Sequence, residues 1–174
     1  MGQPPHFWNA MTGLASLAGV VALIVGGLFG AYEYADRKEM QRATETMAMI
    51  EIWETRGAQQ AYLDLSRALE KHLSDTPAED RNDPDNALTL RDNIARRAMR
   101  DHPGAYDKVV YFFSRLSLCV QASLCSEPVA RTFFGDSLHS FKSWFEDEKA
   151  RRRQWTPAHG RELDVLSVRF QGPE

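Results

Sequence analysis

The sequence predicts an all-α protein in which one N-terminal transmembrane helix precedes a small helical bundle containing an antiparallel helix hairpin. Three observations predict this fold: an apolar stretch without charge before Glu33, amphipathic spacing of three and four in most of the remaining chain, and few β-branched runs. The expected divisions are a short N-terminal tail at 1–9, the transmembrane helix at 10–34, a helical domain at 35–156 and a C-terminal tail at 157–174.

The stretch 10–34 satisfies the length requirement of a membrane span, since about 20 apolar residues at roughly 1.5 Å each cross the hydrocarbon core. Trp8 before it and Tyr32 and Tyr34 at its end are the expected interface anchors, because amphipathic rings favour the membrane surface. A signal peptide fits poorly, because the first thirteen residues contain no Lys or Arg. A buried soluble helix of this length should show a polar face.

Small residues recur at intervals of three or four along the predicted span and so lie on one helix face. They are Thr12, Ala15, Gly19, Ala22, Gly26 and Gly30. Close backbone approach is a main source of packing between helices in lipid, so this face is expected to dock another helix. The sequence leaves open whether the partner is a different integral membrane protein or a second copy.

The flanking charges predict the orientation. Arg37, Lys38 and Arg42 follow the stretch and no basic residue precedes it, which predicts a single-pass protein with its N-terminus outside and its C-terminal domain in the cytoplasm. Cys119 and Cys125, six residues apart, form a possible thiol pair. In the cytoplasm they should stay reduced, whereas a disulfide would overturn the predicted orientation.

The first part of the helical domain, 36–73, has an amphipathic pattern. Met40, Met47 and Ile50 belong to a seam that we expect to contact the core, with a short coiled coil as the alternative. Gly57 interrupts the pattern, so the segment is either one long helix or two helices that meet there. A loop rich in proline and acidic residues follows.

Three further helices are expected. One covers 85–100, and the next covers 105–120 and is apolar on so many sides that it should be central. The third begins after Ser126, a good N-cap, and should form an antiparallel hairpin with the second because the link is short. Two acid–arginine pairs one turn apart near its end, Asp147 with Arg151 and Glu148 with Arg152, predict surface ion pairs. The tail beyond Pro157 is left open as an edge strand, a docking peptide or a disordered segment.

The residue pattern does not predict catalysis. The five histidines form no metal-binding motif, and we expect ordinary surface roles for them. No glycine-rich phosphate loop or nucleophile elbow is present, and a net charge of −3 offers no basic excess for nucleic acid. We therefore expect no enzyme activity, no cofactor, no metal, no nucleic-acid partner and no identified small-molecule substrate.

The segment RLSLCVQASLCSEPVARTFFGDSLHSFKSWFE, together with ETRGAQQAYLDLSRALE and the upstream apolar stretch, resembles a group of uncharacterised bacterial single-span membrane proteins with a helical domain of unknown function. The resemblance implies a helical domain behind one span. It implies no activity, cofactor or catalytic residue.

Together these observations favour a non-catalytic accessory, scaffolding or assembly subunit of a bacterial inner-membrane complex. Its expected partners are the lipid bilayer and an integral membrane protein, bound through the small-residue face. The alternative is a self-associating single-span regulator or sensor, in which the same face pairs two copies.

Overall fold

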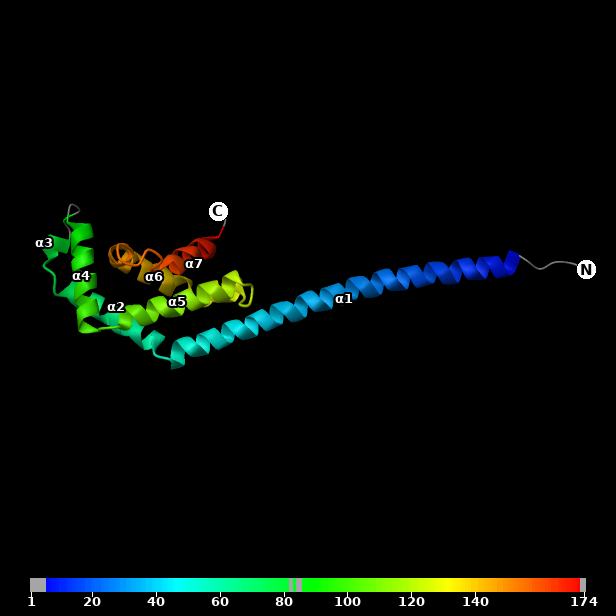
Figure 1. The fold of residues 1–174 in the computed structure, drawn as a ribbon, viewed down its shortest axis with the longest axis horizontal. Helices are drawn as coiled ribbons and strands as arrows, with labels where there is room; N and C mark the ends of the chain where they lie inside the picture. Colours follow the sequence, from blue (N-terminus) through cyan, green and yellow to red (C-terminus); the bar gives the residue numbers. More distant parts are fainter. Residues whose placement is uncertain (1–5, 82, 84–85, 173–174) are drawn as a thin grey trace, which may run out of the picture. The chain divides into compact units, whose positions relative to one another are not determined.

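The computed structural model describes the backbone of residues 6–81, 83 and 86–172, and the side chains of 26, 27, 29–81, 83 and 86–172. Within these residues the chain forms seven helices and no strand, which confirms the predicted all-α helical bundle (Figure 1). The chain divides into two compact units, Met1–Gln41 and Arg42–Glu174. Helix α1, His6–Thr55, begins in the first unit and ends in the second.

The predicted transmembrane helix at 10–34 is wrong as a description of this fold. Among the residues whose side chains the structure describes, no helix is both long enough and apolar enough to cross a membrane. The described part of the predicted span starts at Gly26, and five of the seven residues from Glu33 to Glu39 are charged. Residues 10–25 and 28 have side chains outside the described part.

Helices α1 and α2 meet at Gly57, so the structure selects two helices rather than one. Helix α2 covers Ala58–Ser74, and Gly57 has a φ of 79°, a left-handed conformation that costs glycine little. The last turns of α1 face the core through Thr46, Met49 and Trp53, which are all buried. The predicted core seam is therefore wrong at Met40 and Met47, whose exposed fractions are 64% and 58%.

Helix α5 lies at the centre of the larger unit, and α6 packs against it through aromatic rings. After the short helix α3, Ala78–Arg81, and helix α4, Ala87–Asp101, helix α5 covers Ala105–Gln121 and helix α6 covers Glu127–Arg153. The ring of Phe113 lies 6.4 Å from that of Phe134, and the ring of Tyr106, two turns earlier, lies 5.5 Å from that of Phe145. Later residues of α6 thus contact earlier residues of α5, so the two helices run antiparallel, as expected from the short link.

The segment left open beyond residue 157 contains a helix, α7, Arg161–Gln171. Its Leu163 and Leu166 are buried and Phe170 packs against the core, at a spacing of three and four that belongs to a helix. Helix α7 therefore completes the bundle instead of forming a separate tail.

The basic end of α6 connects three other helices. Arg151 Nη1 lies 2.8 Å from Asp92 Oδ1 on α4, Arg152 pairs with Asp107 on α5, and Arg153 Nη2 lies 2.6 Å from Asp164 Oδ2 on α7. The predicted Glu148–Arg152 pair is confirmed, with the Arg152 Nε to Glu148 Oε1 distance at 2.6 Å. The predicted Asp147–Arg151 pair is wrong, because Arg151 pairs with Asp92 and Glu148 while Asp147 lies near Arg91. These charges hold the bundle together in addition to solvating its surface.

Candidate functional site

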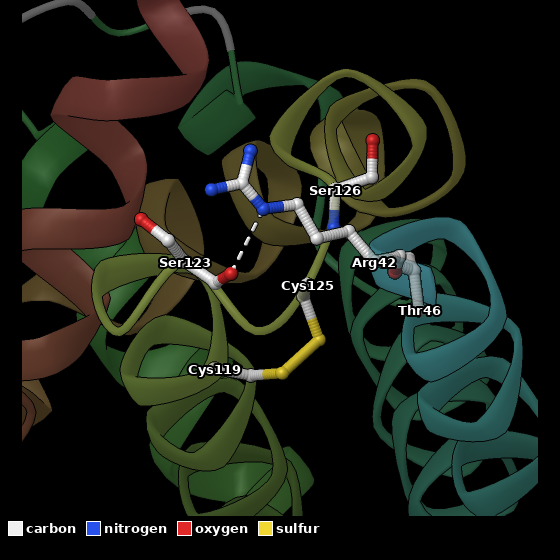
Figure 2. The surroundings of a disulfide bond; sticks show 6 residues. All are labelled: Arg42, Thr46, Cys119, Ser123, Cys125 and Ser126. Atoms are coloured by element: carbon white, nitrogen blue, oxygen red, sulfur yellow. Dashed lines mark hydrogen bonds between the residues drawn. A yellow bond between two sulfur atoms is a disulfide. The ribbon is translucent and has the colours of Figure 1, made fainter. Parts of the chain in front are cut away.

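A disulfide closes the link between α5 and α6. Cys119 and Cys125 are bonded at an S–S distance of 2.04 Å with their Cα atoms 5.2 Å apart (Figure 2). The backbone N–H groups of Leu124 and Cys125 both donate to the Cys119 carbonyl, at 3.0 and 3.1 Å. The sequence left the pair open as reduced thiols or a disulfide, and the structure contains the disulfide. The link between α5 and α6 is therefore a covalently closed loop.

Helix α1 holds this loop through a buried hydroxyl. Thr46 has no exposed surface, and its Oγ1 accepts a hydrogen bond from the Ser126 N–H at 2.8 Å while donating to the Arg42 carbonyl at 2.8 Å. Arg42 Nε donates to the Ser123 carbonyl at 2.9 Å (Figure 2). Because Ser126 is the N-cap residue of α6, these bonds set where α6 begins relative to the last turns of α1.

A groove lies between α1 and α6 beside this attachment. Met47 and Ile50 line it from α1, and Val129 and Phe133 line it from the first turns of α6, together with Pro128 and Thr132, around a volume of about 410 Å³. Met47 and Phe133 keep 58% and 44% of their surface exposed. Exposed large apolar side chains that gather in one hollow, rather than singly, indicate an interaction site. We call these six residues the α1–α6 groove.

The floor of the groove is fixed from behind by the core. Phe134, next to Phe133 in the chain, has no exposed surface and its ring lies 4.8 Å from that of Phe133. On α1, the residues that directly precede Met47 and Ile50, namely Thr46 and Met49, are buried. The groove is therefore preformed on helices that have little freedom to move apart.

Acidic side chains follow the groove on α1. Glu51 comes one turn after Met47, and Glu54 comes one turn after Ile50. Each glutamate therefore lies on the same face of α1 as the groove residue that precedes it. Both are exposed, and neither makes an ion pair with a described residue. The groove thus has an apolar floor with negative charge at one end.

No family model, curated protein or solved structure matches this chain. The resemblance to single-span membrane proteins therefore stays a prediction, and the function has to be argued from the residues.

Of the residues predicted for a transmembrane packing face, only Gly26 and Gly30 are among those whose surroundings the structure describes, and the packing face stays a prediction. Gly26 and Gly30 are exposed, and a Cβ added at either would meet no heavy atom within 4 Å. Tyr32 and Tyr34 are 74% and 70% exposed. The other predicted positions lie outside the residues whose side chains are described, namely Trp8, Thr12, Ala15, Gly19 and Ala22.

The side chains of two histidines form hydrogen bonds between separate elements: His72 joins α2 to α4, and His159, in the turn between α6 and α7, contacts α5. His72 Nε2 lies 2.7 Å from Asp101 Oδ2, and this bond holds the pKa of Asp101 below its ordinary value. His159 Nε2 lies 3.3 Å from the Tyr106 hydroxyl, and burial, reinforced by the charge of Arg152, lowers the pKa of His159. In the described part of the chain, no group of three or more His, Cys, Asp or Glu is placed to hold a metal ion.

Sequence analysis missed the α1–α6 groove because it assigned Met47 to the core. The three-and-four spacing identified an apolar row on α1, but two neighbouring rows satisfy such spacing, and the buried one contains a threonine. A buried Thr46 with its partner 80 residues away has no local signal in the sequence.

Proposed function

We propose that this chain is a non-catalytic accessory or scaffolding subunit of a protein complex and that its α1–α6 groove binds an amphipathic helix of the partner. The observation that carries the proposal is the pair of exposed apolar side chains, Met47 and Phe133, on opposite walls of a preformed groove. Binding to a groove that is already ordered avoids the entropic cost of forming it, which favours a dedicated binding surface.

The occupant follows from the chemistry of the groove. An apolar floor between two helices accepts the apolar stripe of a third, in the way that helix-in-groove complexes form. Glu51 and Glu54 at one end favour a partner helix with Lys or Arg beside its apolar stripe, because charge complementarity fixes the direction in which a helix docks.

The disulfide supports a location of the larger unit outside the cytoplasm. Disulfides persist in oxidising compartments such as the bacterial periplasm and are rare in the cytosol. We therefore propose an extracytoplasmic place for the Cys119–Cys125 loop, opposite to the placement expected from Arg37, Lys38 and Arg42. Association with the bacterial inner membrane stays a prediction. Rapid alkylation of intact cells followed by mass analysis tests the compartment, since two alkylated cysteines would contradict an oxidising location.

Photocrosslinking tests the groove in cells. With p-benzoylphenylalanine in place of Met47 in the full chain, we expect one adduct with a different protein. Phe133→Asn should abolish that adduct, whereas Val168→Asn, at a residue that is 66% exposed on α7, should leave it unchanged. An adduct between two copies of the chain would refute the subunit proposal in favour of the self-associating regulator. An adduct that survives Phe133→Asn would refute the groove as the docking site.

A peptide experiment tests the chemistry of the occupant. A model amphipathic helix built from Leu and Lys should bind the purified protein more tightly than the matching helix of Leu and Glu. The double variant Glu51→Gln, Glu54→Gln should remove this preference without removing binding, because the apolar floor remains. Equal affinity of the original protein for both peptides would contradict the inferred charge of the partner.

A further inference from the structure

A second pocket lies where α1 ends and α2 begins, against an exposed side of α5. Its volume is about 270 Å³. Ile52 and the buried Phe112 supply its apolar surface, and the 65% exposed Tyr111 stands beside them. The floor is held by the core, because the Phe112 ring lies 4.7 Å from the ring of the buried Trp53.

Three cations converge on this pocket. Arg56 lies in the link that follows α1, and Lys108 and Arg115 come from α5, two turns apart on the same face. None of the residues that line the pocket is acidic, and none of the three cations makes an ion pair with a described residue. Arg115 instead lies over the Tyr111 ring, with its guanidinium carbon 5.9 Å from the ring centre.

This lack of partners contrasts with the basic end of α6, where Arg151, Arg152 and Arg153 each contact a carboxylate on another helix. Like charges that share a pocket repel one another, and an anion bound among them relieves that repulsion. Ala58, the first residue of α2, also lines the pocket, and the first turn of α2 has no acidic residue. Because α1 ends where α2 begins, the negative dipole end of α1 opposes the positive end of α2, so the positive potential of the pocket comes from its three cationic side chains.

We propose that this pocket binds a phosphate monoester. The phosphate carries close to two negative charges at neutral pH and has three acceptor oxygens, which suit two guanidinium groups and an ammonium group. The apolar surface of Ile52 and Phe112, with the ring of Tyr111, takes the organic part next to the ester oxygen. The small volume favours a short organic group. The proposal does not depend on the α1–α6 groove.

The phosphate could be supplied by a soluble ester or by the headgroup of phosphatidic acid, so the experiment uses both. The full chain is titrated with phenyl phosphate, and in parallel with phosphatidylcholine vesicles that do or do not contain phosphatidic acid. The reporter for phenyl phosphate is the indole N–H resonance of Trp53, assigned through Trp53→Phe, because this ring packs on the pocket floor. Vesicle binding is measured by sedimentation.

The test variant is Arg56→Gln, Arg115→Gln. The matched control is Arg97→Gln, Arg100→Gln, which removes the same charge from exposed positions on α4 that line none of the described pockets. We expect the test variant to weaken binding by about tenfold, since charge-assisted hydrogen bonds are lost from an exposed site. The control should retain the original affinity. Thermal unfolding of both variants verifies that they fold.

The results of the two titrations distinguish a soluble ester from a lipid headgroup as the source of the phosphate. If phenyl phosphate shifts the Trp53 resonance to saturation and the test variant binds it more weakly, the ligand is a soluble ester. If the protein binds only vesicles that contain phosphatidic acid, and the test variant loses this binding, the ligand is the lipid headgroup. Equal loss in the test and control variants would show a general charge effect and overturn the proposal. Absence of binding to both probes would overturn it as well.

Discussion

Replacing Thr46 with valine tests whether the disulfide-closed loop is held in place by the buried hydroxyl on α1. Valine keeps the shape of threonine but cannot hydrogen-bond, so the Ser126 N–H loses the acceptor at 2.8 Å. A buried donor left unpaired costs roughly 1–3 kcal/mol. The Ser126 N–H also donates to the Arg42 carbonyl at 3.2 Å and keeps this acceptor in the variant. We therefore expect the free energy of unfolding to fall by roughly 1–1.5 kcal/mol, at the low end of that range.

Urea unfolding followed by circular dichroism measures this loss. The matched control is Thr55→Val on the same helix, where the hydroxyl also donates to the carbonyl four residues earlier, at 2.6 Å, but is exposed to water. The control should change the free energy of unfolding by less than about 0.5 kcal/mol. If Thr46→Val is as stable as Thr55→Val, the hydroxyl does not hold the loop and our account of the groove's support is wrong.

Two further predictions concern pH and packing. The folded state lowers the pKa of His159, so it binds fewer protons than the unfolded chain, and stability should fall as the pH drops below about 6.5. His159→Gln should reduce this fall in urea titrations between about pH 7.5 and pH 5.5, and an unchanged slope would contradict the assignment. Phe134→Ala, in the core, should cost roughly 3–5 kcal/mol, whereas Phe133→Ala, in the groove, should cost less than about 1 kcal/mol in thermal unfolding. Similar losses for the two would place Phe133 in the core.

Much of the helical bundle could be predicted from local patterns. The apolar residues that surround α5 predicted its central place, and nine of its side chains are buried. The short link at 122–126 predicted the antiparallel pairing with α6, because helices joined by a short loop commonly pack as antiparallel neighbours. Hydrophobic periodicity and loop length depend only on residues that are close in the chain, so both can be recognised in a single sequence.

Other features were misjudged because two patterns compete over short distances. In α7, Leu163 and Val165 suggested a strand alternation, while Leu163, Leu166 and Phe170 fit a helix, and packing on the core selects the helix. At the other end of the chain, the apolar stretch at 10–34 predicted a membrane span, but the described part of α1 is interrupted by charges from Glu33 onward. Length and hydropathy alone did not settle its role.

The sequence by itself determined that the chain is helical and where most helices begin and end, because hydrophobic period, glycine and proline act locally. Only the tertiary structure decided which row of α1 faces the core, so that Thr46 is buried while Met47 is exposed. It also decided that Arg56, Lys108 and Arg115 share one pocket. Such contacts join residues far apart in the chain, and they arise from the packing of whole helices rather than from any neighbouring residue.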